Sequence, residues 1–193
     1  MKKNPNPQGK GVVPLLDTLS SSRALVAAIP KKIDQISSEL FTSLFVLHSR
    51  FQFKPVVGKS YFLYQRSYQK KIDFHLSLIS PQEWDTASSG MFIGECILQD
   101  DITWSLSLDA EAAHNQTLMA LIAIKRDEFE NMLDKANTVE DSLPFYLEKL
   151  PFYQRVYASA LANSLQASMN KSGLLGLSYS QARKNLLSDK SDD

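Results

Sequence analysis

Three residues of this sequence, Gly58-Lys59-Ser60, end in the way that a phosphate-binding Walker A loop ends. Such a loop needs another glycine five residues before its second glycine, because its backbone curls around the phosphates, and Phe53 stands at that position. The loop must also open a helix, whereas the residues after Ser60 read Tyr-Phe-Leu-Tyr, which favours a strand. We therefore expect no nucleotide site here and interpret Gly58 as a turn that leads into a strand.

Other catalytic and metal-binding patterns are incomplete as well. The run from Gly176 to Ser180 lacks the last glycine and the preceding strand of a G-x-S-x-G nucleophile elbow. The three histidines lie on different predicted elements, without the local spacings that bind a metal. Glu83, Glu95 and Asp101 could still converge at one end of a sheet and act as general acid and base. We expect no metal, no cofactor and no catalytic residue, and we keep an enzyme with clustered carboxylates as one alternative.

Aromatic rings alternate with cations between Lys59 and Lys71. Proteins that bind single-stranded nucleic acid stack bases on such rings, at about 1–3 kcal/mol each, and contact the phosphates with the cations. Tyr61 and Tyr64 would be the stacking rings, with Lys59 and Arg66 beside them. The same pattern is typical of a strand whose rings enter the core, so the exposure of the two tyrosines decides between these interpretations. Binding of RNA or single-stranded DNA through this strand is the first alternative function, and the enzyme with clustered carboxylates is the second.

Composition indicates a packed globular protein and little about its partners. The 193 residues contain 44% apolar residues and equal numbers of basic and acidic residues, 21 of each. Residues 1–71 hold twelve Lys and Arg against three Asp and Glu, which suggests either a basic surface or two halves that attract each other. Cys96 is the only cysteine, so an intrachain disulfide is excluded. Prolines interrupt the basic start, and the uncharged run 156–170 is too short and polar to span a membrane. We expect a cytoplasmic protein that does not insert into membranes.

The elements that would position these residues can be read from the hydrophobic periodicity. Apolar residues recur at spacings of three and four from Lys31 to Arg50, which predicts a helix over 31–50. Alternation with period two predicts four strands within 58–108, and the short links between them favour an antiparallel meander. Ser80-Pro81-Gln82-Glu83 resembles a capped helical turn, which would hold Trp84 between the second and third strands. Residues 109–187 read as helices, including a short piece over 143–150 and an Ala- and Ser-rich helix from Pro151 to about Lys171.

Two runs in the strand region carry a resemblance to a known family. They are Ile79-Ser80-Pro81-Gln82-Glu83-Trp84 and Asp101-Ile102-Thr103-Trp104. With them the sequence resembles the domain-of-unknown-function family 2452, whose shorter animal members cover about this block and whose bacterial members extend nearly end to end. The resemblance implies that the sheet is the shared unit and that the helical C-terminal part belongs to the bacterial form. It implies no activity, cofactor or catalytic residue.

The sequence therefore predicts an α+β fold with an N-terminal helix, a four-stranded antiparallel β-meander and a C-terminal helical region. We expect an extended basic arm over 1–14, a single domain over 15–187 and a polar tail over 188–193. The predicted function is a non-enzymatic protein-interaction module that engages an unidentified protein through the aromatic and basic sheet edge and the arm, with its oligomeric state left open. The predicted binding residues are Lys59, Tyr61, Tyr64, Arg66, Glu83, Trp84, Asp101 and Trp104.

Overall fold

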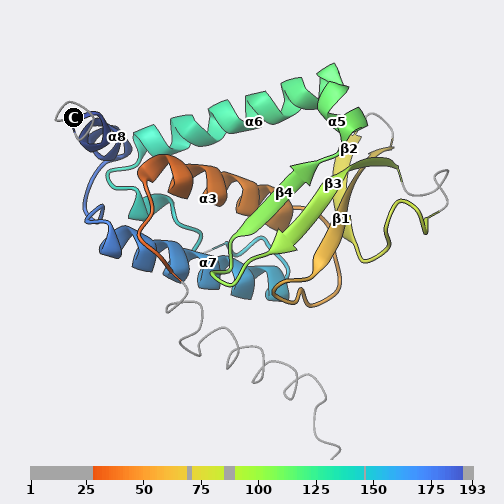
Figure 1. Ribbon diagram of the computed structural model, residues 1–193, viewed down its shortest axis with the longest axis horizontal. Coiled ribbons are helices and arrows are strands. Elements are labelled where there is room, and N and C mark those ends of the chain that lie inside the picture. Colours follow the sequence, from red (N-terminus) through yellow and green to blue (C-terminus); the bar gives the residue numbers. More distant parts are fainter. Residues whose placement is uncertain (1–27, 69–70, 85–89, 146, 189–193) are drawn as a thin grey trace, which may run out of the picture.

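A computed structural model describes residues 28–68, 71–84, 90–145 and 147–188 (Figure 1). Its N-terminal helix, four-stranded antiparallel sheet and C-terminal helices confirm the predicted α+β class. The predicted arm over 1–14 and the tail after Ser188 lie outside the described residues. The elements are α3 (Ile33–Leu47), β1 (Ser60–Tyr68), β2 (Lys71–Ser77), β3 (Met91–Leu98), β4 (Trp104–Leu108), α5 (Ala110–His114), α6 (Gln116–Lys135), the 3-10 turn η1 (Glu140–Ser142), α7 (Phe152–Lys171) and α8 (Tyr179–Ser188).

Helix α3 lies at the centre of the molecule, between α6 and α7, with the sheet at its C-terminal half (Figure 1). Its apolar residues at spacings of three and four, Ile33, Ile36 and Leu40, are fully buried, as the periodicity predicts. The helix ends at Leu47, three residues earlier than predicted, and the backbone N–H of His48 caps it by donating to the carbonyl of Leu44. Because α3 contacts the sheet on one side and three later helices on others, it fixes the parts of the chain relative to one another.

The strand order is β2-β1-β3-β4, with each neighbouring pair antiparallel. The predicted meander is therefore wrong at one connection, because β3 pairs with β1 rather than with β2. The link from Leu78 to Gly90 is long enough to cross the end of β1, and it includes the turn at Ser80–Glu83. As predicted, Glu83 reaches back to Ser80, whose backbone N–H donates to Glu83 Oε2 at 3.3 Å and whose Oγ donates to the same oxygen at 2.9 Å, but the segment forms a turn rather than a helix.

The two faces of the sheet have different surroundings. Tyr61, Leu63 and Cys96 belong to the main core, which also contains the buried residues of α3. Tyr64, on the opposite face, packs against His75 and Trp84, with ring centroids 5.3 Å from each. Trp84 therefore covers the second face at Tyr64, and the rings of both tyrosines are enclosed.

The C-terminal part differs from the prediction over 143–150. The described residues of this range, 143–145 and 147–150, form turns and irregular segments after η1 rather than a helix. Pro144 lacks the N–H that a helix interior needs. The Ala-rich helix is confirmed as α7, and its Ala158 and Ala162 are fully buried, which allows α3 to approach closely. Tyr179 at the start of α8 also reaches α3, where its hydroxyl lies 3.3 Å from Ser37 Oγ.

Candidate functional site

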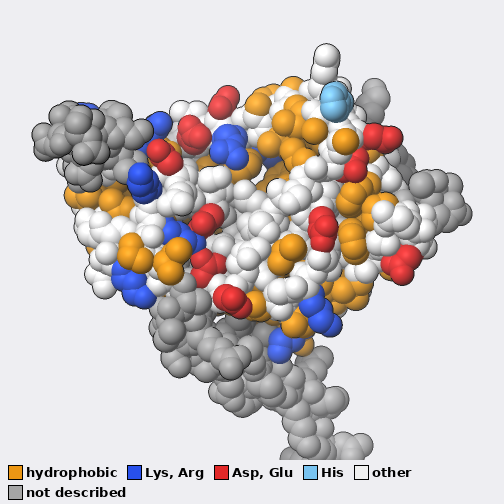
Figure 2. Space-filling view, in the orientation of Figure 1, with side chains coloured by type: hydrophobic (Ala, Val, Ile, Leu, Met, Phe, Trp, Pro, Cys, Tyr) orange, Lys and Arg blue, Asp and Glu red, His pale blue; other side chains and the backbone are white. Residues whose placement is uncertain are grey.

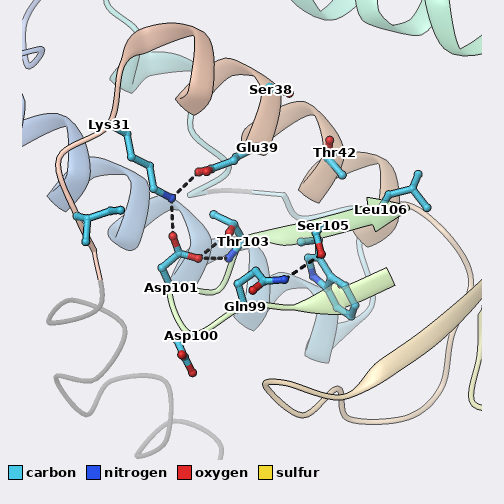
Figure 3. A pocket seen from close by; sticks show the side chains of 12 residues that line it. Lys31, Ser38, Glu39, Thr42, Gln99, Asp100, Asp101, Thr103, Ser105 and Leu106 are labelled. Atoms are coloured by element: carbon cyan, nitrogen blue, oxygen red, sulfur yellow. Dashed lines mark hydrogen bonds and ion pairs between the residues drawn. The ribbon is translucent and has the colours of Figure 1, made fainter. Parts of the chain in front are cut away.

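A groove of about 560 Å³ lies between α3 and the β3–β4 hairpin (Figure 3). Helix α3 contributes Ser38, Glu39 and Thr42, which share one face because they are three or four residues apart. On the face shown in Figure 2, polar surface separates α3 from the strands, and acidic side chains border it. The remaining lining residues are Ile29, Lys31, Gln99, Asp100, Asp101, Thr103, Trp104, Ser105 and Leu106.

Lys31 joins the elements around one end of this groove. Its side chain is only 6% exposed, and its Nζ donates to Glu39 Oε2 and to Asp101 Oδ2, each at 2.5 Å (Figure 3). Its backbone N–H donates to Ser172 Oγ at 2.8 Å, just after the end of α7. One residue therefore connects the segment before α3, α3 itself, the β3–β4 turn and the end of α7.

The ion pairs keep these groups charged. Burial alone would lower the pKa of Lys31, but the hydrogen bonds and charges of Asp101 and Glu39 outweigh burial and raise that pKa. Burial would likewise raise the pKa of Asp101, yet the hydrogen bonds from Lys31 and Thr103 lower it. A nucleophilic lysine must lose its proton and a general acid must hold one at neutral pH. Lys31 therefore keeps its proton and Asp101 its negative charge, so this network stabilises the fold and is not arranged for proton transfer.

The turn between β3 and β4 holds Asp101 in place through an uncommon backbone conformation. Ile102 has φ of 66°, which costs a β-branched residue about 1–3 kcal/mol. Its side chain is 4% exposed, so burial in the core offsets this strain. The turn places Asp101 Oδ1 where it accepts from Thr103 N at 3.1 Å and from Thr103 Oγ1 at 2.6 Å.

Strand β4 forms one edge of the sheet, and its register shows which backbone groups point outward. In an antiparallel pair, alternate residues direct N–H and C=O to the partner strand. Gln99 N donates to Thr103 O, and Asp109 N donates to Ile93 O, so the odd-numbered residues of this stretch pair with β3. The N–H and C=O groups of the even-numbered residues, including Leu106, therefore point away from the sheet.

Only at the Trp104 end of β4 does an outward backbone group form a hydrogen bond to another described residue. The N–H of Trp104 donates to Ser43 Oγ of α3 at 2.9 Å. Within the part of the chain that the structure describes, the outward groups of Leu106 and Leu108 have no hydrogen-bond partner. The opposite edge differs, because Arg50 bonds to Phe74 O and Leu76 N along β2.

The predicted aromatic and basic edge is wrong. Its strand, β1, lies between β2 and β3 in the interior of the sheet. Tyr61 and Tyr64 are each 1% exposed, and their hydroxyls bond to the backbone of Val56 and of Ile79. Neither ring can stack on a base, so the hypothesis of nucleic-acid binding through this strand loses its basis. Lys59 and Arg66 are exposed at the two ends of the strand.

The three predicted carboxylates have different neighbours. Asp101 binds Lys31, whereas Glu83 accepts from Ser80. Glu95 follows the alternation of β3 onto the face opposite the buried Cys96. No hydrogen bond or ion pair among the described residues joins any two of them, so the structure gives no support to a catalytic cluster.

The tryptophans have the structural roles that their size suggests. Trp84 packs on Tyr64 and also on His75, whose two ring nitrogens have no hydrogen-bond partner among the described residues. Burial, followed by the charge of Arg66, lowers the pKa of His75. Trp104 is 2% exposed and lines the groove.

Of the eight predicted binding residues, only Asp101 and Trp104 line the groove. Lys31 and Glu39 carry no sequence signal beyond their place in a predicted helix, and the open edge of β4 carries none. The alternating sequence of β4 indicates a strand. Whether that strand lies at the edge of the sheet depends on which strands pair, and the pairing cannot be deduced from local sequence.

Among the described residues, no group of three His, Cys, Asp or Glu side chains is arranged to hold a metal ion. Cys96 is a free, buried thiol, and burial together with the charge of Glu95 raises its pKa to about 12. It is therefore not a reactive thiolate at neutral pH. None of the helices described is long and apolar enough to cross a membrane.

Comparisons with known proteins give a family but no described activity. Residues 30–124 match the family model described as "Protein of unknown function (DUF2452)". This range contains α3, the whole sheet and every groove residue except Ile29. No curated protein and no solved structure matches the chain.

Proposed function

We propose that this chain, which belongs to the family of unknown function DUF2452 through residues 30–124, is a protein-interaction module. Its ligand is an extended segment of a partner protein, which lies beside β4 and fills the groove against α3. We place the module in the cytoplasm as part of this proposal, because its one cysteine, Cys96, is a buried free thiol.

One observation carries the proposal, the unpaired outward edge of β4. Leu106 and Leu108 present backbone N–H and C=O groups that no described residue satisfies. An extended peptide can bond to such groups and add a strand to the sheet, a common mode of peptide recognition. The five residues of β4 include no charged residue and no proline, two features that otherwise protect an edge against pairing.

The groove supplies the space that such a segment needs. Side chains of a strand alternate between two faces, so half of those on an added segment would point toward α3. There they would meet Ser38 and Thr42, whose hydroxyls can donate and accept hydrogen bonds. On the hairpin side, Gln99 and Ser105 already bond to each other at 2.9 Å and offer further polar atoms.

The proposal can be tested by removing a single outward donor. Leu106→Pro deletes the N–H of Leu106 but leaves the ladder between β3 and β4, since that N–H does not point to β3. The full chain would first be used to select binders from a displayed library of random twelve-residue peptides. We expect selected peptides to bind the wild type and to lose about five- to 150-fold in affinity for Leu106→Pro, because a lost buried hydrogen bond costs about 1–3 kcal/mol.

A matched variant separates the backbone from the side chain. Leu106→Ala removes most of the side chain and keeps the N–H, so peptide affinity should fall much less than for Leu106→Pro. Thermal unfolding of both variants would show that each is folded. Equal affinity of the selected peptides for wild type and Leu106→Pro, or no selection above a blank surface, would refute strand addition.

A further inference from the structure

We propose that the segment accepted along β4 is basic and that one of its Lys or Arg side chains binds the exposed carboxylate of Asp100 at the turn end of the groove. This inference rests on the proposed strand addition and names the chemistry of the partner. The charged residues that line the groove, and their position relative to the unpaired edge of β4, support this inference.

The groove has an excess of negative charge. Its ionisable lining residues are Glu39, Asp100 and Asp101 against Lys31, which leaves a net charge of −2. The ammonium of Lys31 is already shared between Asp101 and Glu39. Asp100 is exposed and has no hydrogen-bond or ion-pair partner among the described residues. Glu39 keeps 31% of its side chain exposed. The carboxylate of Asp100 is therefore available to a cation from outside, and Glu39 adds to the negative charge of the groove.

A short segment can span the distance along β4 from its unpaired backbone groups to the turn at Asp100. A strand rises about 3.3 Å per residue, so a segment paired with Leu106 and Leu108 comes level with the turn at Asp100 a few residues further on. At that point α3 closes on the strand edge, because Ser43 caps the N–H of Trp104. A backbone cannot continue to pair there, but a long Lys or Arg side chain can still extend into the groove toward the carboxylates.

The same charges disfavour other occupants. An anionic lipid surface or a nucleic-acid phosphate would be repelled by Asp100 and Glu39. A second copy that paired through β4 would bring another set of these carboxylates to the interface. The basic residues Lys2, Lys3 and Lys10 of this chain are a competing source of the same chemistry, and the test includes them.

The test uses three matched peptides and the isotope-labelled full chain. The peptides are acetylated and amidated Val-Lys-Val-Lys-Val, Val-Gln-Val-Gln-Val and Val-Glu-Val-Glu-Val, and the readout is the NMR shift of the amides from Ser105 to Leu108 during titration. We expect the lysine peptide to bind most tightly and the glutamate peptide least tightly, with the difference decreasing as salt rises.

Two variants examine the site of the cation. Asp100→Asn should weaken the lysine peptide about two- to fivefold and leave the glutamine peptide unchanged, the size expected for a single exposed ion pair. Asp134→Asn makes the same chemical change on an exposed residue of α6 that does not line the groove, and it should alter neither peptide.

Each outcome separates this inference from the proposed function. If no peptide shifts the β4 amides, strand addition itself fails. If all three bind alike, strand addition stands and the preference for a basic segment is overturned. If the lysine peptide binds more tightly once Lys2, Lys3 and Lys10 are replaced by Gln in the full chain, the occupant is this chain's own N-terminal segment and the assignment to a partner is overturned.

Discussion

At the scale of single residues, the arrangement around Lys31 explains how distant parts of the chain are held together. A buried ammonium is costly unless it is paired, and here two carboxylates from different elements supply the pairing. Asp101 in turn depends on Thr103 and on the strained turn at Ile102. The groove therefore has one end whose geometry is set by electrostatics rather than by apolar packing.

Replacing Lys31 tests this account. Lys31→Met keeps an apolar stem of similar length and removes the ammonium, so that Glu39 and Asp101 face each other without a cation. We expect the free energy of unfolding at pH 7 to fall by about 3 kcal/mol, as measured by urea denaturation. Lys54→Met, at an exposed lysine, should change it by less than about 0.5 kcal/mol. A similar small loss for both variants would contradict the account.

The pH dependence of that loss follows from the two pKa shifts. The folded pKa of Asp101 is lowered, so its contribution is present above the ordinary pKa near ~4 and disappears as the pH falls through the lowered folded value. The folded pKa of Lys31 is raised, so its contribution is present below the ordinary pKa near ~10.4 and disappears as the pH rises through the raised value. The difference between wild type and Lys31→Met should therefore be constant from about pH 5 to pH 9 and shrink outside that range.

Residue types alone predicted this site only in part. The alternating rings of 60–68 predict a strand, and this segment is the strand β1. Which face of a strand is covered, however, depends on the elements that pack against it. Tyr61 lies in the main core and Tyr64 packs on Trp84, so both rings are buried and neither is free to stack on a base. Asp101 was singled out as a carboxylate, whereas its partner Lys31 lies 70 residues earlier and could not be matched to it.

At the scale of elements, the position of β4 depends on a close approach to β3. Gly94 lies opposite Leu108, and a Cβ at Gly94 would lie 2.2 Å from Ser107 O and 2.9 Å from Leu108 Cα. Both contacts are with backbone atoms, which cannot rotate away. The end of β4 that carries the proposed docking edge therefore needs a glycine on its neighbour.

A pair of alanine substitutions measures that requirement. Gly94→Ala should lower the free energy of unfolding by at least about 2 kcal/mol, because β4 must move away from β3. Gly173→Ala should cost only about 1–2 kcal/mol, since Gly173 has φ of 66° but no atom within 4 Å of the added Cβ. Amide hydrogen exchange should also show faster exchange in β4 for Gly94→Ala. Unchanged exchange in β4, with equal costs for the two variants, would show that the close approach does not position the strand.

Most elements could be predicted from periodicity, but their arrangement could not. The apolar spacing in α3 and the alternation in β3 are local signals, and both elements lie where those signals placed them. Strand order is a matter of nonlocal pairing. Short links favoured a meander, yet the link after β2 crosses β1, which makes β1 an interior strand and β4 the open edge.

At the scale of the whole molecule, the groove exists only because α3 lies beside the sheet edge and is fixed there by α6, α7 and α8 (Figure 1). Its walls come from parts of the chain that are far apart in sequence, and one buried cluster extends from α3 through the sheet to α8. A rigid helix beside the unpaired edge of β4 forms a preorganised groove. Most of the conformational entropy lost on binding would therefore be lost by the partner segment.

Residue-resolved hydrogen exchange of β4, in the free protein and with a selected peptide, tests the central claim most directly. In the free protein we expect slow exchange at Ser105 and Ser107, whose amides bond to β3, and fast exchange at Leu106 and Leu108, whose amides point outward. Bound peptide should slow Leu106 and Leu108 and leave Trp104, already bonded to Ser43, unchanged. Fast exchange at Leu106 and Leu108 that persists at saturating peptide would contradict docking by strand addition.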